Sequence, residues 1–325
     1  MKKNLLIWLS FLLSFNAVTK TVIHAGYLID GSNDNPMNEM SIYVVDNKIS
    51  EIVTGYIEPE PDDQYIDLSG YTVLPGLIDM HVHLTSNQSS TSRYTESTSL
   101  NPADYAIRSV NNAKKTLMAG FTTVRNLGGS DTVTVSLRNE IAKGTVPGPR
   151  IYTAGLSIAS TGGHADGTNS LNRELSSDPG PADGIINSPV DAYKAVRHRY
   201  KEGADLIKIT ATGGVLSNAK NGQNPQMTLE EIKSVVDAAR DYGFKVAAHA
   251  HGSEGIIRAV KAGVDSIEHG TLMDEEGMTL MRKEGTYYVP TLLAGAWVAE
   301  KALIEDYYPP FVQKKALEIG PQLIS

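Results

Sequence analysis

The feature that most constrains the fold is a pattern that occurs six times: an amphipathic, helix-like segment ends on glycine and a β-rich run follows at once. Examples are "LMAGFTTV", "RDYGFKVAAHA" and "VKAGVDSIEH". A glycine after the last helical turn can adopt the left-handed conformation that ends a helix, so each one turns the chain directly into a strand. Helices and strands that alternate in this way predict a parallel sheet. The six glycines are Gly120, Gly144, Gly203, Gly243, Gly263 and Gly285.

The connections between these elements differ in length according to their direction. The helix-to-strand turns consist of a glycine or a few residues, whereas long polar loops follow the strands that end near Leu84, Gly155 and Ala211. In barrels of alternating strands and helices, long loops of this kind build the active site at the carboxyl-terminal face. The predicted fold class is therefore α/β, a (β/α)8 TIM-type barrel. A doubly wound open sheet gives the same local pattern and is the alternative.

The N-terminal part of the chain follows another pattern. Residues 1–20 place two lysines before an apolar run, which is the layout of a signal peptide and predicts a secreted or periplasmic protein. The run is shorter than the roughly 20 apolar residues that span a bilayer, so we expect no stable membrane span. Residues 21–72 contain short strand-like runs between turn residues and predict the N-terminal part of a small β-sandwich module. Residues 73–325 would form the barrel.

Composition limits the partners of the protein. The formal net charge of -8 argues against nucleic acid, because proteins that bind polyanions need a basic face. The chain has no cysteine, which excludes disulfides, thiolate metal sites and a cysteine nucleophile. Any metal must therefore be held by nitrogen and oxygen atoms. Homo-oligomerisation stays open.

Basic side chains that face inward recur on four of the predicted strands. Side chains alternate between the two faces of a strand, so the histidines of "GLIDMHVHL" share one face, as do those of "AAHAHG". Taken alone, each histidine could instead be a hydrogen-bonded core residue, and Lys208 could extend its amine to the barrel rim. Together they place five nitrogens at one end of the barrel, and imidazole suits zinc. These nitrogens belong to His81, His83, Lys208, His249 and His269.

Two further requirements accompany a metal site of this composition. A neutral imidazole is a good ligand when a partner orients its other nitrogen, and Glu268, Asp79 or backbone carbonyls are available for this. A buried lysine becomes a ligand only if its charge is reversed. Reaction of the neutral Lys208 amine with carbon dioxide gives a carbamate anion, which can bridge two divalent ions.

The motifs "PGLIDMHVHL", "TTVRNLGG", "TGGHADG", "LIKITATGGV", "AAHAHG" and "AGVDSIEHG", in this order, resemble the amidohydrolase superfamily, and within it the imidazolonepropionase-like, Xaa-Pro dipeptidase (prolidase) branch. The resemblance implies two divalent metal ions, with zinc favoured, and a metal-bridging hydroxide that attacks an amide or peptide bond. Carried over by position, His81 and His83 would bind one ion, carboxylated Lys208 would bridge, and His249 and His269 would bind the second.

The same resemblance gives His251 and His164 a role in binding the substrate, although a loop histidine such as His164 can also be simply solvated. Arg125 fits either an anion contact or a structural salt bridge. The function favoured by the sequence is a metal-dependent dipeptidase of the Xaa-Pro type, acting on a dipeptide or another small molecule. A hydrolase of another cyclic amide or carbamate would use the same site and is the second hypothesis.

The chain departs from the family pattern near its end. That pattern includes a catalytic aspartate on an eighth strand, whereas we count seven strands, the last in "TYYVPTLLA", followed by a helical region. Asp306 falls in a helix or turn and cannot replace the aspartate. We therefore expect a C-terminally truncated chain whose open barrel exposes two strand edges. A third hypothesis follows, an inactive fragment that lacks the catalytic Asp.

Overall fold

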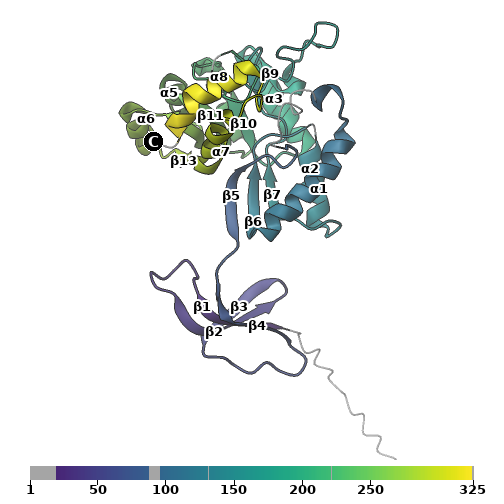
Figure 1. Cartoon of the computed structure of the whole chain (residues 1–325), viewed down its shortest axis with the longest axis vertical. Coiled ribbons are helices and arrows are strands. Elements are labelled where there is room, and N and C mark those ends of the chain that lie inside the picture. The colour runs from purple at the N-terminus through teal and green to yellow at the C-terminus, as the bar shows by residue number, and fades with distance from the viewer. Residues whose placement is uncertain (1–19, 88–95, 131, 221, 324–325) are drawn as a thin grey trace, which may run out of the picture. The chain divides into compact units, whose positions relative to one another are not determined.

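The computed structural model describes residues 20–87, 96–130, 132–220 and 222–323 (Figure 1). The predicted signal peptide lies outside these residues except for its last one, and secretion stays a prediction. In the described part of the chain, no helix is both long enough and apolar enough to cross a membrane. The chain divides into two compact units, Met1–Gly76 and Leu77–Ser325.

The first unit contains a four-stranded sheet with the order β3-β2-β1-β4. Strand β1 pairs antiparallel with β2 and parallel with β4, and β2 and β3 form an antiparallel hairpin. Asp46 and Asn47 in the hairpin turn both have positive φ, as a tight two-residue turn requires. The described residues show one sheet here, so the sandwich stays a prediction. The strands are β1 Thr21–Leu28, β2 Met37–Val45, β3 Lys48–Thr54 and β4 Gln64–Val73.

The second unit alternates strands and helices. Strands β5, β6 and β7 form one parallel sheet, and β10, β11, β12 and β13 form another. These seven strands are β5 Leu77–Val82, β6 Phe121–Asn126, β7 Arg150–Thr153, β10 Ile207–Thr210, β11 Val246–Gly252, β12 Ser266–Leu272 and β13 Tyr287–Val289. A short parallel pair, β8 Ala159–Ser160 and β9 Ile185–Ile186, lies in the connection after β7.

The helices begin and end as the sequence pattern indicates. Helix α4 starts with a capping box between Thr228 and Glu231, and α3, α5 and α6 end on glycines in the left-handed conformation. The α-helices are α1 Pro102–Met118, α2 Val133–Ala142, α3 Pro189–Glu202, α4 Leu229–Asp241, α5 Ser253–Ala262, α6 Glu275–Glu284, α7 Leu292–Ala302 and α8 Pro310–Ile319.

Backbone hydrogen bonds connect the two parallel sheets. The Asp205 amide donates to the Thr153 carbonyl at 2.7 Å, and Ile158 forms a parallel bridge with Ile209. The seven strands therefore follow one another in sequence order. Among the described residues no pairing joins β13 to β5 and no strand follows β13. The TIM-type barrel and the C-terminal truncation of the chain stay predictions.

The largest hydrophobic cluster determines which face of each central strand is left for the site. Ile207 and Ile209 of β10 pack with Ala248 and Ala250 of β11 against helices α3, α4 and α5. Because side chains alternate, the neighbouring positions on these strands face the other way. Those positions hold Lys208, Thr210, His249 and His251, all buried.

Candidate active site

Six of the eight histidines of the chain lie close together where the parallel strands end. The rings of His81 and His269 are 4.8 Å apart between centroids, and those of His249 and His269 are 4.7 Å apart. Lys208 lies beside them on β10, and its charge contributes to lowering the pKa of His81, His249, His251 and His269. The structure thus brings all seven predicted site residues together: His81, His83, His164, Lys208, His249, His251 and His269.

His81 and His83 point their Nε2 atoms at each other across 3.3 Å. The Nδ1 atom of His81 is 2.8 Å from a Glu268 oxygen, and that of His83 is 3.3 Å from the Gly128 carbonyl. A carboxylate and a carbonyl only accept hydrogen bonds, so we place the proton of each ring on Nδ1. Burial, followed by the Lys208 charge, lowers the pKa of His81 well below its usual range, so this ring is neutral.

Both Nε2 atoms then present lone pairs toward each other, an arrangement that a cation between them would stabilise. Two nitrogens bound to one tetrahedral zinc at about 2.0–2.1 Å are about 3.3 Å from each other. The pair formed by His81 and His83 therefore fits a single divalent ion.

The second pair is oriented in a comparable way by its hydrogen-bond partners. His249 donates from Nε2 to the Gly213 carbonyl at 2.9 Å, which leaves the lone pair on Nδ1. His269 places Nδ1 2.8 Å from the Thr291 hydroxyl, so its Nε2 stays available as a ligand. His269 also has a positive φ of 72°, which is uncommon for a residue other than glycine and occurs often at functional sites.

Lys208 is the least expected side chain in this setting. Its side chain is buried, with only 3% of the residue exposed. Burial, its largest influence, lowers the pKa of Lys208 to about 8, although the negative charge of Glu268 acts in the opposite direction. A larger share of this amine is therefore neutral near neutral pH than in an ordinary lysine. A neutral amine is the form that reacts with carbon dioxide.

The cluster offers two imidazoles per ion rather than a complete cage. Within the described residues, no three His, Asp or Glu side chains surround one point closely enough to hold a metal. A further ligand would complete the coordination of an ion at each pair. Neutral imidazole nitrogens suit zinc and related divalent ions.

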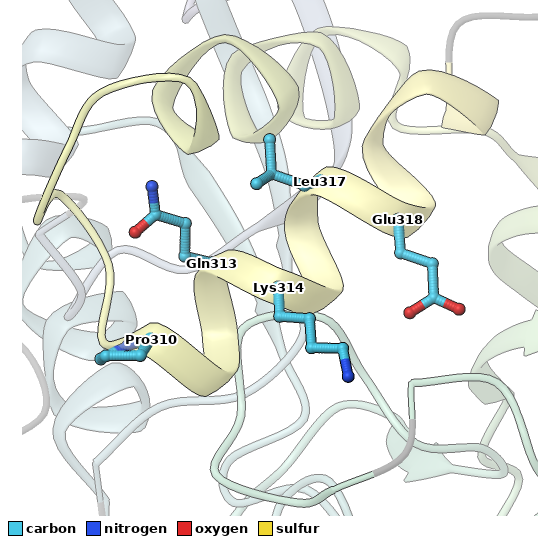
Figure 2. A pocket seen from close by; sticks show the side chains of 5 residues that line it. All are labelled: Pro310, Gln313, Lys314, Leu317 and Glu318. Atoms are coloured by element: carbon cyan, nitrogen blue, oxygen red, sulfur yellow. The ribbon is translucent and has the colours of Figure 1, made fainter.

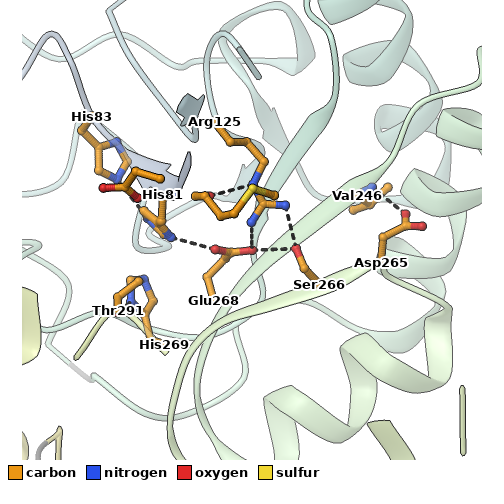
Figure 3. Close-up of polar contacts among 11 residues, drawn as sticks. His81, His83, Arg125, Val246, Asp265, Ser266, Glu268, His269 and Thr291 are labelled. Carbon is orange, nitrogen blue, oxygen red and sulfur yellow. Dashed lines mark hydrogen bonds and ion pairs between the residues drawn. The ribbon is translucent and has the colours of Figure 1, made fainter. Parts of the chain in front are cut away.

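A buried ionic network supports the first histidine pair (Figure 3). The Glu268 side chain is fully buried and accepts hydrogen bonds from Arg125 and Ser266, both at 2.6 Å, in addition to its contact with His81. Arg125 also donates to the Met80 carbonyl at 2.7 Å. Of the two roles that the sequence left open for Arg125, the structure shows the salt bridge. Asp79 accepts from the His81 backbone amide rather than from a ring.

His164 and His251 flank the second pair. The His164 ring stacks on His249 with 4.2 Å between centroids, and the His251 ring stacks on His269 at 5.0 Å. Nδ1 of His251 lies 2.8 Å from the Thr271 hydroxyl. Nδ1 of His164 is buried and has no hydrogen-bond partner among the described residues. A polar group of a bound molecule would satisfy this atom.

Sequence reasoning did not identify the individual groups that orient His249, His251 and His269. Thr291, Thr271 and the Gly213 carbonyl carry no pattern that distinguishes them from ordinary loop residues. The structure also has an open hollow on the outer face of α8, which contains none of the predicted site residues (Figure 2). It is lined by Pro310, Gln313, Lys314, Leu317 and Glu318.

Comparison with known proteins agrees with the resemblance seen in the motifs. The chain is 31% identical over 287 residues to the ochratoxinase of Aspergillus niger, a match that covers 83% of this chain and only 58% of that protein. A crystal structure of an Xaa-Pro dipeptidase with bound methionine is 52% identical, with a TM-score of 0.90 over 94% of this chain and 75% of that one. A prolidase complexed with N-methylphosphonate-L-proline is 32% identical, with a TM-score of 0.83 over 94% and 74%. Residues 72–307 match the model of the amidohydrolase family, and the chain belongs to that family.

Proposed function

We propose that the protein is a binuclear metal-dependent hydrolase of amide or peptide C–N bonds, and specifically a dipeptidase of the Xaa-Pro type. The observation that carries the proposal is the facing pair of Nε2 lone pairs on His81 and His83, 3.3 Å apart. The second pair, His249 and His269, and the buried amine of Lys208 lie beside it.

In this proposal, His81 and His83 hold one divalent ion, His249 and His269 hold the other, and Lys208 contributes to both as its carbamate. Zinc ions bound there would polarise the scissile carbonyl and make water a nucleophile near neutral pH. The protein groups fix the nitrogen that each of the four rings presents. Glu268 does this for His81, and the Gly213 carbonyl does it for His249.

His164 and His251 are the proposed contacts to the substrate. Burial, as the main cause, lowers the pKa of His164 to about 3 and that of His251 to about 4, so both rings are neutral at pH 7. A neutral imidazole can donate or accept a hydrogen bond, which suits the carbonyl oxygen or the carboxylate of a short peptide. The buried and unpartnered Nδ1 of His164 supports this assignment.

The solved relatives support the substrate class. The two similar structures named above are an Xaa-Pro dipeptidase and a prolidase with a proline phosphonate, and both match 94% of this chain. The likeness to an ochratoxinase favours, as the second candidate, a substrate other than a dipeptide at the same centre.

The test is hydrolysis of a panel of Xaa-Pro and Xaa-basic dipeptides with zinc and bicarbonate supplied, alongside a metal determination. We expect two equivalents of metal and cleavage of Xaa-Pro substrates that stops when a chelator is added. Two equivalents of metal without dipeptide cleavage would keep the metal centre and contradict dipeptidase activity of this 325-residue chain. Cleavage by the 325-residue chain would refute the hypothesis of an inactive fragment.

A further inference from the structure

Helix α8 carries one charged side chain in the middle of its buried face. Val312, Ala316 and Ile319 face inward and pack with Val215 of the loop after β10. Lys315 lies among them and is only 6% exposed, and burial lowers its pKa to about 8. An apolar residue would complete the stripe at positions i, i+3, i+4 and i+7. A buried ammonium is unfavourable unless it is hydrogen-bonded, so its partners must explain its presence.

The ammonium of Lys315 reaches the loop that follows β10, about 100 residues earlier in the chain. Its Nζ donates to three backbone carbonyls, those of Gly214 at 2.9 Å and of Ser217 and Ala219 at 2.7 Å each. An ammonium has three donors, and all three are used. The side chain therefore draws the carbonyls of residues 214, 217 and 219 toward one point and gives this loop a defined shape.

The same loop contacts two of the site histidines. The Gly213 carbonyl accepts the hydrogen bond from His249 Nε2 at 2.9 Å, and it also accepts one from Thr212 at 2.8 Å. A side-chain carbon added at Gly214 would overlap the His164 ring, so backbone and ring are in direct contact there. A shift of this backbone would therefore change both the orientation of the His249 ring and the position of the His164 ring.

We infer that Lys315 is a positioning residue of the active site. By holding three carbonyls of the loop, it keeps the Gly213 carbonyl where it fixes the proton of His249 on Nε2 and directs Nδ1 to the metal. The inference rests on the proposed function, in which His249 is a ligand. It concerns a helix that lies beyond the residues matched by the family model, which end at residue 307.

The test compares Lys315→Met, which keeps the length of the side chain and removes the donors, with Lys314→Met on the exposed face of the same helix (Figure 2). We expect Lys315→Met to bind zinc about tenfold more weakly or worse, as for the loss of other groups that orient ligands. In the metal-free protein, the ring 15N signals of His249 should change from the Nε2–H tautomer to a mixture. Lys314→Met should change neither property.

A structural role alone would change the free energy of unfolding and nothing else. If Lys315→Met is less stable but keeps the zinc affinity and the His249 ring signals of the unaltered protein, the inference is wrong. The ring signals are measured without metal or substrate, so they report on positioning even if no dipeptide is cleaved. Absence of cleavage by the unaltered chain, with zinc bound, would count against dipeptidase activity of this chain and not against the positioning role of Lys315.

A second variant covers the case in which Lys315→Met does not fold. Lys315→Ala leaves a space that matches propylammonium, so adding this cation should return the His249 ring signals of the unaltered protein. Propanol has the same shape without the charge and should not do so. Failure of propylammonium to restore the ring signals of a folded Lys315→Ala protein would overturn the inference.

Discussion

Replacing Glu268 by glutamine tests the network beneath the first histidine pair. The carboxylate receives hydrogen bonds from Arg125, Ser266 and His81, and its side chain is fully buried. Glutamine has one acceptor oxygen and loses the charge, so Arg125, whose side chain is 12% exposed, keeps a buried charge without a counterion. Breaking a buried ion pair from one side destabilises a protein by about 3–5 kcal/mol, which is the decrease in unfolding free energy that we expect.

The same substitution should weaken metal binding. If the new amide nitrogen faces His81, that ring must accept at Nδ1, and its proton moves to the Nε2 atom that faces His83. Removing a group that orients a ligand lowers metal affinity by about 10–100-fold. Urea unfolding of the metal-free protein and zinc titration against a chelating dye measure the two effects.

The matched control is Glu254→Gln, which removes the same charge from an exposed pair with Arg258, 2.8 Å apart. Exposed pairs contribute about 0–1 kcal/mol, so this variant should resemble the unaltered protein. The reasoning is refuted if Glu268→Gln loses no more stability than Glu254→Gln and binds zinc as tightly as the unaltered chain.

Three further predictions concern other parts of the site. Burial lowers the pKa of Lys208 to about 8 from 10.5, so between these pH values the unfolded chain binds the proton that the folded metal-free protein has lost. The free energy of unfolding should therefore rise with pH across this window, by up to about 3 kcal/mol. Denaturant unfolding at a series of pH values measures this rise, and Lys208→Met should not show it. Zinc should raise the melting temperature in a concentration-dependent way, and calorimetry should show most of this effect lost in His83→Ala, because a ligand stabilises only the state that binds it. The methyl group of Gly214→Ala must displace the His164 ring, at a cost in free energy of about 1–3 kcal/mol. The KM for dipeptide substrates should therefore rise about tenfold. An unchanged KM would contradict a substrate role for His164.

Local patterns were sufficient to predict the strand and helix order of the second unit. Gly203, Gly263 and Gly285 end their helices in the left-handed conformation, with φ values of 87°, 91° and 71°. This conformation is a property of the glycine and its immediate neighbours, so the sequence displays it directly. The contacts that would close a barrel are long-range, and no local pattern encodes them.

In the candidate site, too, local patterns predicted some features and long-range contacts determined the others. Strand alternation was enough to place His249 and His251 on one face, away from Ala248 and Ala250. Alternation could not give their different partners, because the Gly213 carbonyl lies in the loop after β10 whereas Thr271 lies on β12. The bond between His269 and Thr291 spans 22 residues and depends on how the loop after β13 folds. Residue type and spacing alone do not specify such a contact.

Two of the buried charged residues, neither with a definite role from the sequence alone, point to the same physical requirement. Glu268 and Lys315 contact no substrate in the proposed function. Stabilisation of the fold does not explain them either, because apolar residues of similar volume often stabilise a fold as well as a buried charge or better. Each of them instead fixes the environment of one histidine, His81 directly and His249 through the Gly213 carbonyl. A metal ligand needs its lone pair on a particular nitrogen, and a neutral histidine has two choices. We therefore interpret both charges as devices that select the tautomer, which explains why the fold tolerates them where an apolar side chain would pack.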